Sequence, residues 1–255
     1  MLSAHSLLWH YLWVAPNLLL LILALILWRR RAHRDFFAFF VFAIIGSLEQ
    51  LTLYACDVIP SVSATTFWNV LWTGLLIEAL LKFILIDALF GRIFGPHPPI
   101  ARLGKILIRS VAVLLVLAAS LLAAFSRVSN PHWIVAGPHL LEQTIYLIES
   151  GLLLFVFVFS AYFKLRSERV ALGICLGLAV SACVHLATWA FSVNNGSPQV
   201  SVYLDFLNMA TYHVCVLLWF YFLLLPHKVA TKSAVSVPEH NLEVWNREME
   251  RLLHS

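Results

Sequence analysis

Charged side chains interrupt a strongly apolar segment of the chain, residues 67–91. Glu78 and Lys82 are four residues apart, so on a helix they share one face, with the acid on the favoured N-terminal side. A charge at the centre of a bilayer costs about 2.5 to 3.5 kcal/mol. These two residues must therefore face a protein interior or a water-filled cavity, either as a self-neutralising pair or as part of a binding or relay site.

Other apolar segments carry polar faces of the same kind. Glu142, Tyr146 and Glu149 are spaced i, i+4, i+7. The same helical spacing links Asp205, Asn208 and Tyr212, and it also links Ser181, His185, Thr188 and Ser192. At 1.5 Å per residue, five of the ionisable side chains lie roughly 9 to 18 Å below the outer membrane surface. They are Glu49, Glu78, Glu149, His185 and His213. The candidate ligand-binding or proton-relay residues are Glu49, Gln50, Glu78, Lys82, Tyr146, Glu149, His185, Asn208, Tyr212 and His213.

The three acids Glu49, Glu78 and Glu149 and the base Lys82 would together cost roughly 10 to 14 kcal/mol if each faced lipid. We therefore expect these side chains to share a partly hydrated protein interior. That interior could be a structural polar network, or a cavity for a small polar or amphiphilic ligand in a sensor or a carrier. A metal site could draw on Glu49, Glu78, Glu149, His185 and His213, although no H-E-x-x-H or E-x-x-H spacing is present. Cofactor and metal therefore stay open, no catalytic residue is assigned, and a metal-dependent hydrolase is the least favoured function.

The composition indicates a helical membrane protein. Of 255 residues, 61% are apolar and only 12% are charged, whereas soluble domains have about a quarter charged. Apolar runs of about twenty residues recur along the chain. They predict a bundle over residues 1–226 with seven membrane-spanning helices at about 8–28, 36–55, 67–90, 104–125, 139–163, 170–193 and 201–225.

The basic residues sit in short loops beside these spans, so the net charge of +4 does not indicate nucleic-acid binding. They fall in alternate loops, which predicts an outer amino end and an inner carboxyl end in a plasma or bacterial inner membrane. The loops predicted to be cytoplasmic hold Arg29, Arg30, Arg31, Arg34, Arg92, Arg102, Lys105, Lys164, Arg166 and Arg169. Four cysteines without a C-x-x-C motif argue against a disulfide framework.

An internal repeat and a distinct tail complete the organisation. Sliding the chain by 135 residues lays the first two spans on the fifth and sixth, and one further residue aligns the third with the seventh. This spacing indicates a 3+1+3 parallel repeat, or seven helices with similar loop lengths by chance. Residues 227–255 form a cytoplasmic tail with an amphipathic helix at about 239–253. The tail helix could dock on the bundle, lie on the bilayer, or pair with a copy or a cytoplasmic partner.

Three resemblances follow from these features. The seven-helix order and the repeat resemble the SWEET sugar carriers, although Pro16 is the only proline in a span that opens a repeat. The orientation is similar to that of microbial rhodopsins and G-protein-coupled receptors, but the seventh span has no lysine to hold retinal. The ending WNREMERLL, residues 245–253, resembles small bacterial seven-helix membrane proteins, a resemblance that implies no activity.

The leading hypothesis is a non-enzymatic sensor or receptor-like protein that binds a small ligand in an intramembrane polar cavity. The alternative is a SWEET-like or proton-coupled carrier that uses the same cavity.

Overall fold

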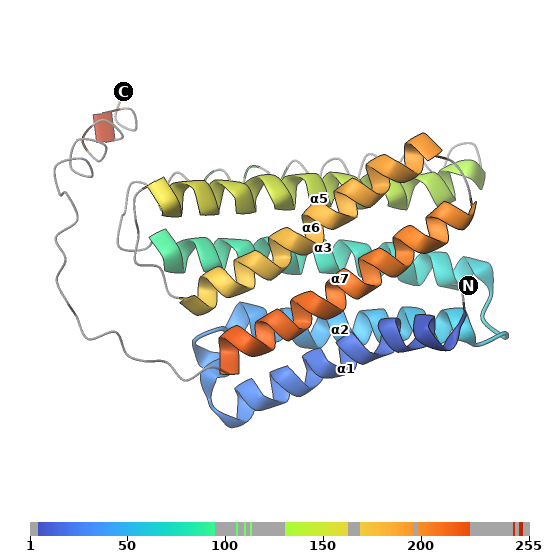
Figure 1. Ribbon diagram of the computed structural model, residues 1–255, viewed down its shortest axis with the longest axis horizontal. Helices are drawn as coiled ribbons and strands as arrows, with labels where there is room; N and C mark the ends of the chain where they lie inside the picture. Colours follow the sequence, from blue (N-terminus) through green and yellow to red (C-terminus); the bar gives the residue numbers. More distant parts are fainter. Residues whose placement is uncertain are drawn as a thin grey trace.

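The computed structural model is a bundle of long helices. It describes residues 5–94, 131–162, 169–195 and 198–224, together with the single residues 106, 110, 113, 247, 250 and 251. The described residues form six α-helices and one 3-10 turn (Figure 1). In chain order these are α1 (Leu7–Arg29), η1 (Ala32–Arg34), α2 (Phe37–Val58), α3 (Ala64–Phe94), α5 (Pro131–Tyr162), α6 (Arg169–Asn195) and α7 (Pro198–Leu224).

Each of these helices covers a span that the sequence predicts, with shifts at the ends. α5 begins at Pro131 instead of residue 139, and α7 begins at Pro198 instead of residue 201. Proline suits the first helical position because its missing N–H has no helical partner there. α3 starts early because Ser63 Oγ accepts a hydrogen bond from the Thr66 backbone N–H, at 3.1 Å.

Two predicted helices lie outside the described residues. The span at 104–125 is described only at Ile106, Ser110 and Val113, which are helical. The tail helix at 239–253 is described only at positions 247, 250 and 251, also helical.

The six helices form a ring. α1 packs on α2, α2 on α3, α3 on α5, α5 on α6 and α6 on α7, and α7 returns to α1. α3 also touches α6 across the ring. We call the end of the bundle where α1, α3, α5 and α7 begin the first end, and the opposite end the second end (Figure 1). α3 finishes at the second end, whereas α5 starts at the first.

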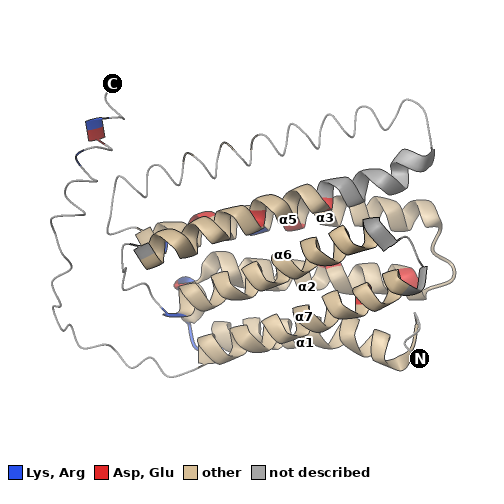
Figure 2. Ribbon diagram, turned by 45° about the horizontal axis from the view of Figure 1, so that its top comes forward, with Lys and Arg blue, Asp and Glu red and all other residues tan. Residues whose placement is uncertain are grey.

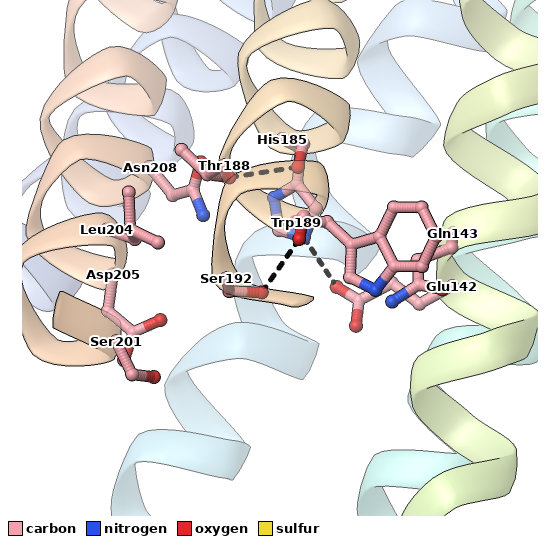
Figure 3. A pocket seen from close by; sticks show the side chains of 10 residues that line it. All are labelled: Glu142, Gln143, His185, Thr188, Trp189, Ser192, Ser201, Leu204, Asp205 and Asn208. Carbon is pink, nitrogen blue, oxygen red and sulfur yellow. Dashed lines mark hydrogen bonds and ion pairs between the residues drawn. The ribbon is translucent and has the colours of Figure 1, made fainter. Parts of the chain in front are cut away.

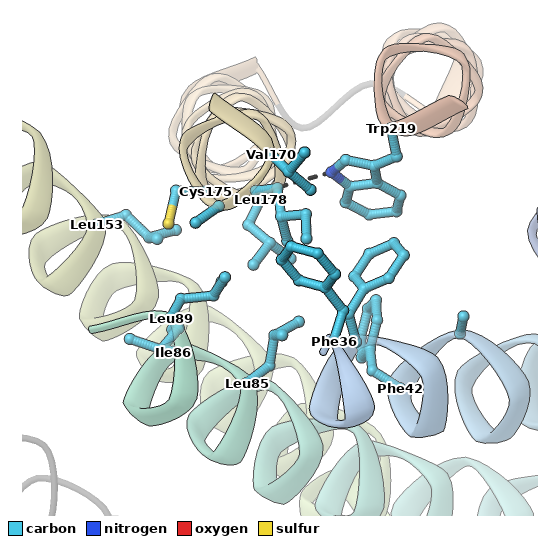
Figure 4. Close-up of a cluster of buried hydrophobic side chains, with 14 of the residues drawn as sticks. Phe36, Phe42, Leu85, Ile86, Leu89, Leu153, Val170, Cys175, Leu178 and Trp219 are labelled. Atoms are coloured by element: carbon cyan, nitrogen blue, oxygen red, sulfur yellow. Dashed lines mark hydrogen bonds between the residues drawn. The ribbon is translucent and has the colours of Figure 1, made fainter. Parts of the chain in front are cut away.

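The second half of the bundle is filled by an apolar core to which all six helices contribute. Figure 4 shows Phe36, Leu89, Leu153, Val170 and Trp219 converging on this core. Large, fully buried side chains of this kind pack closely against one another. The largest fully buried side chains are Trp219, Phe39, Phe90, Phe94, Leu20, Leu23, Leu27, Leu85, Ile86, Leu153 and Ile174.

Two glycines of α6 bring α7 into close contact with the α6 backbone. The ring of Phe222 covers Gly173, and the indole of Trp219 covers Gly177, where a Cβ atom would collide with them. The close approach lets Trp219 Nε1 donate a hydrogen bond of 3.3 Å to the Ile174 carbonyl oxygen. Glycines four residues apart commonly form such contacts between membrane helices.

The outer surface suits a lipid environment. Large apolar side chains such as Leu25, Ile84, Leu154 and Tyr221 are exposed along the helices. Five of the helices, α1, α2, α5, α6 and α7, are long and apolar enough to cross a membrane. α3 is not among them, and it carries Glu78, Lys82 and Asp87 in its central and later turns. The architecture is that of an integral membrane protein.

Charge is distributed unevenly along the bundle axis (Figure 2). Apart from Lys82, the basic residues of the helices and their described connections lie at the second end. One of them ties α3 to the connection that leads into α2: Arg92 Nη1 donates to the Asp35 carbonyl oxygen, and its guanidinium lies 4.2 Å from the ring centroid of Phe36. The basic residues at this end are Arg29, Arg30, Arg31, Arg34, Arg92 and Arg169.

Candidate functional site

A buried lysine joins α3 to α5. Lys82 Nζ lies 3.0 Å from Glu78 Oε1 on its own helix and 3.2 Å from Glu149 Oε2 on α5. Lys82 is 6% exposed and Glu149 is 1% exposed, so this interhelical ion pair is almost completely removed from solvent. A buried ion pair contributes little net stability, but losing one partner leaves an uncompensated charge. We call Glu78, Lys82 and Glu149 the ion triad.

Two aromatic rings extend from the ion triad towards α6. Lys82 Nζ lies 4.3 Å from the ring centroid of Tyr146, within the range of a cation–π contact. The Tyr146 ring stacks on the His185 ring, with centroids 4.1 Å apart and an interplanar angle of 30°. His185 Nε2 then lies 3.2 Å from Glu142 Oε1. One cation–π contact, one ring stack and one polar contact thus form a continuous chain, Lys82–Tyr146–His185–Glu142, which we call the relay chain.

The relay chain ends at a partly enclosed cavity of about 250 Å³ between α5, α6 and α7. The cavity lies towards the first end, because its walls come from the last turns of α6 and the first turns of α7. Figure 3 shows Asp205 and Ser201 on one wall and Glu142 and Gln143 on the facing wall. The lining residues are Glu142, Gln143, His185, Thr188, Trp189, Ser192, Ser201, Leu204, Asp205 and Asn208.

A hydroxyl contact fixes the wall of the cavity between α6 and α7. The Thr188 hydroxyl lies within hydrogen-bond distance of two acceptors, Asn208 Oδ1 at 3.0 Å and the His185 carbonyl oxygen at 2.9 Å. Because Thr188 is 5% exposed, this contact holds Asn208 in place at the cavity edge. Asn208 is the predicted site residue that α7 contributes to the cavity.

The remaining predicted residues on α2 lie beside the ion triad. The Glu49 side chain packs directly on the backbone of Gly74 in α3, where any Cβ atom would displace it. Gln50 Nε2 donates a 3.1 Å hydrogen bond to Glu49 Oε2. Glu49 is close enough to Glu78 and Lys82 to interact with both electrostatically. Glu49 and Gln50 therefore border the ion triad and are not part of the cavity wall.

Tyr212 and His213, the two predicted residues in the middle of α7, point in different directions. Tyr212 is close enough to Glu49, Glu78 and Lys82 to interact with all three electrostatically, which places it on the interior side. His213 instead faces α1, where its ring lies 5.7 Å from that of Tyr11. Its Nδ1 atom is buried and has no hydrogen-bond partner among the described residues. The structure thus brings nine of the ten predicted residues around one interior region and leaves His213 outside it.

The arrangement offers hydrogen bonding and charge, but no preformed metal site in the part of the chain that the structure describes. The sequence-based candidate set omits several residues that line the cavity, including Glu142, Gln143, Trp189 and Asp205. The helical spacing that links Glu142 to Tyr146 and Asp205 to Asn208 was the available signal for two of them. The same signal was available for the other two, since Gln143 precedes Tyr146 by three residues and Trp189 follows His185 by four.

No protein-family model, no curated protein and no solved structure matches this chain.

Proposed function

We propose that this protein is a receptor-like sensor that binds a small polar ligand in the cavity between α5, α6 and α7. The observation that carries the proposal is the connection of a polar cavity at one end to a buried ion triad through the relay chain. The other half of the bundle is closed by the apolar core. A ligand that enters from the first end therefore meets charged groups and stops there.

The relay chain gives the ligand a way to change the bundle. A ligand that binds Glu142 competes with His185 for the same carboxylate, and His185 stacks on the ring that faces Lys82. A changed His185 position alters the surroundings of the ammonium group that links α3 to α5. Ligand binding thus acts on the packing of two helices, which is the differential contact that a switch requires.

The proposal includes seven membrane-spanning helices, with the first end outside and the second end in the cytoplasm. Arginines at the second end support this orientation. A seventh helix over residues 104–125 is supported by the positions of α3 and α5, since α3 ends at the second end and α5 begins at the first. In this arrangement the tail, residues 227–255, emerges in the cytoplasm of a plasma or bacterial inner membrane and contacts a cytoplasmic partner or a second copy.

A carrier is the second candidate, and the pattern of helix contacts favours it. The helices α1, α2 and α3 contact one another in the same order as α5, α6 and α7 do. The contact between α3 and α5 then corresponds to the contact between α7 and α1. A parallel repeat about an axis along the bundle would produce this pattern. A cavity open towards one end and closed at the other also fits one state of alternating access. Uptake into proteoliposomes that disappears in Glu78→Gln would favour the carrier over the sensor.

A cavity-blocking variant tests the binding proposal. Ser192→Trp places an indole in the cavity, whereas Thr52→Trp makes the same change at an exposed position of α2. The full-length protein in nanodiscs is screened against a library of small polar compounds by thermal unfolding. A ligand at one hundred times its dissociation constant stabilises the folded state by about 2.7 kcal/mol.

We expect at least one compound to stabilise the wild type and Thr52→Trp but not Ser192→Trp. Binding that persists unchanged in Ser192→Trp, or a library with no stabilising compound, contradicts a ligand site in this cavity.

A further inference from the structure

The described residues of the cavity wall include more acidic than basic side chains. Two of its ten lining residues are carboxylates, Glu142 from α5 and Asp205 from α7, and none is lysine or arginine. Among the described lining residues, the group able to carry positive charge is His185, which already lies 3.2 Å from Glu142. A wall of this kind attracts a cation and repels an anion.

The one lysine nearby does not reverse this charge. Lys82 lies between the carboxylates of Glu78 and Glu149, at 3.0 and 3.2 Å. The stacked rings of Tyr146 and His185 separate its ammonium group from Glu142. The positive charge of Lys82 is thus neutralised locally and is not presented to the cavity.

The other lining groups suit an ammonium ion. Oxygen acceptors come from Thr188, Ser192, Ser201, Gln143 and Asn208, and Trp189 supplies an aromatic surface. Carboxylates, amide and hydroxyl oxygens, and an indole ring are the groups that bind organic cations. Figure 3 shows the two carboxylates on facing walls, so a cation between them has an anionic group on each side.

We propose that the cavity binds a small aliphatic amine in its ammonium form, an inference that rests on the proposed ligand-binding function. The ammonium group lies near Glu142 and Asp205 and displaces His185 from the Glu142 carboxylate. The aliphatic part of the ligand packs against Trp189 and Leu204. This exchange of an imidazole for an ammonium group at Glu142 also explains how an amine, unlike a neutral compound, acts on the relay chain.

Four compounds with the same four-carbon skeleton test the charge class. These are 1,4-diaminobutane, butylamine, 1,4-butanediol and succinate, added to the full-length protein in nanodiscs at equal ionic strength. We expect at least one of the two amines to raise the unfolding temperature with a saturable dependence on concentration. We expect no shift with the diol or with succinate.

Variants of the two carboxylates locate the binding. Glu142→Gln and Asp205→Asn should each weaken amine binding roughly tenfold or more, because each removes a charged hydrogen-bond acceptor. Asp57→Asn is the matched control, since Asp57 lies at the first end of α2 and is not part of the cavity wall. If a carboxylate variant fails to fold, Trp189→Leu keeps both carboxylates and should still weaken amine binding about threefold or more.

The outcomes separate this inference from the ligand-binding proposal. Succinate or butanediol binding that Ser192→Trp abolishes would support the ligand site and overturn the amine inference. Amine binding that is equal in wild type, Glu142→Gln and Asp205→Asn would also overturn it. If none of the four compounds binds, the amine inference is wrong, and the library screen then decides on the ligand site alone.

Discussion

Glu149→Gln should destabilise the protein far more than Glu78→Gln, although both carboxylates contact the same ammonium group. Their distances to Lys82 Nζ are nearly equal, 3.2 Å for Glu149 and 3.0 Å for Glu78. The difference lies in their surroundings, because the Glu149 side chain is 2% exposed and the Glu78 side chain is 23% exposed. Glu149 also belongs to a different helix from Lys82, whereas Glu78 lies one turn away on α3.

The magnitudes follow from this difference. Two unit charges 3.2 Å apart interact by about 5 kcal/mol at an effective dielectric constant near 20, and desolvation offsets part of that gain. Removing one partner of a buried pair typically costs about 3 to 5 kcal/mol. Because Glu78 remains beside Lys82, we expect about 3 kcal/mol for Glu149→Gln. An i,i+4 pair with partial exposure contributes only about 0.5 kcal/mol, so Glu78→Gln should cost about 1 kcal/mol or less.

Equilibrium unfolding in mixed detergent micelles, followed by tryptophan fluorescence, measures both free energies. A double-mutant cycle with Lys82→Met isolates the interhelical pair. In the Lys82→Met background the buried Glu149 carboxylate has lost the ammonium group that balances its charge. Adding Glu149→Gln should then leave the free energy of unfolding unchanged or increase it. Equal costs for the two glutamine variants, or costs for Lys82→Met and Glu149→Gln that simply add, would refute this account of the ion triad.

Two further predictions concern packing and orientation. Gly177→Ala should destabilise the protein by about 1 to 3 kcal/mol, because its new Cβ collides with Trp219; Gly151→Ala, where a Cβ meets no atom within 4 Å, should be neutral or stabilise by up to about 1 kcal/mol. The same unfolding assay compares them, and equal effects would contradict the close helix contact. A membrane-impermeant maleimide should label Cys56 in intact cells. This partly exposed thiol lies near the C-terminus of α2, at the first end of the bundle. Labelling only in inverted vesicles, with Cys56→Ser as the negative control, would reverse the proposed orientation.

The helices and their shared faces could be predicted from sequence because helical periodicity decides them. Glu142, Tyr146 and Glu149 lie on one face of α5 at any orientation of that helix. In the structure this face meets α3 through Lys82 and α6 through His185. The cost of exposing charge to lipid predicts in the same way that the face of α3 with Glu78 and Lys82 points inward.

The rotation of each helix about its axis could not be predicted from spacing. Tyr212 and His213 are consecutive, so they point about 100° apart, and only one of them can face the centre of the ring. Packing against α1 and α6 decides between them, and it turns Tyr212 inward and His213 towards Tyr11. The His185–Glu142 pair is unpredictable for the same reason, because it depends on how α5 and α6 are rotated towards each other.

The predicted 3+1+3 repeat, applied to the two halves of the ring, argues that the ion triad is more than a structural network. Under the 135-residue offset, Glu149 corresponds to Val14, and with one further residue Lys82 corresponds to Leu218. The ring therefore closes between α7 and α1 with apolar residues at the positions where α3 and α5 carry an ion pair. Because apolar side chains suffice for closure there, and replacing a buried ion pair by apolar residues is often neutral or stabilising, packing alone does not explain charges between α3 and α5. The proposed role in binding or relay would explain them, because both require a charge that a second group can approach, and the cavity lies two aromatic rings away.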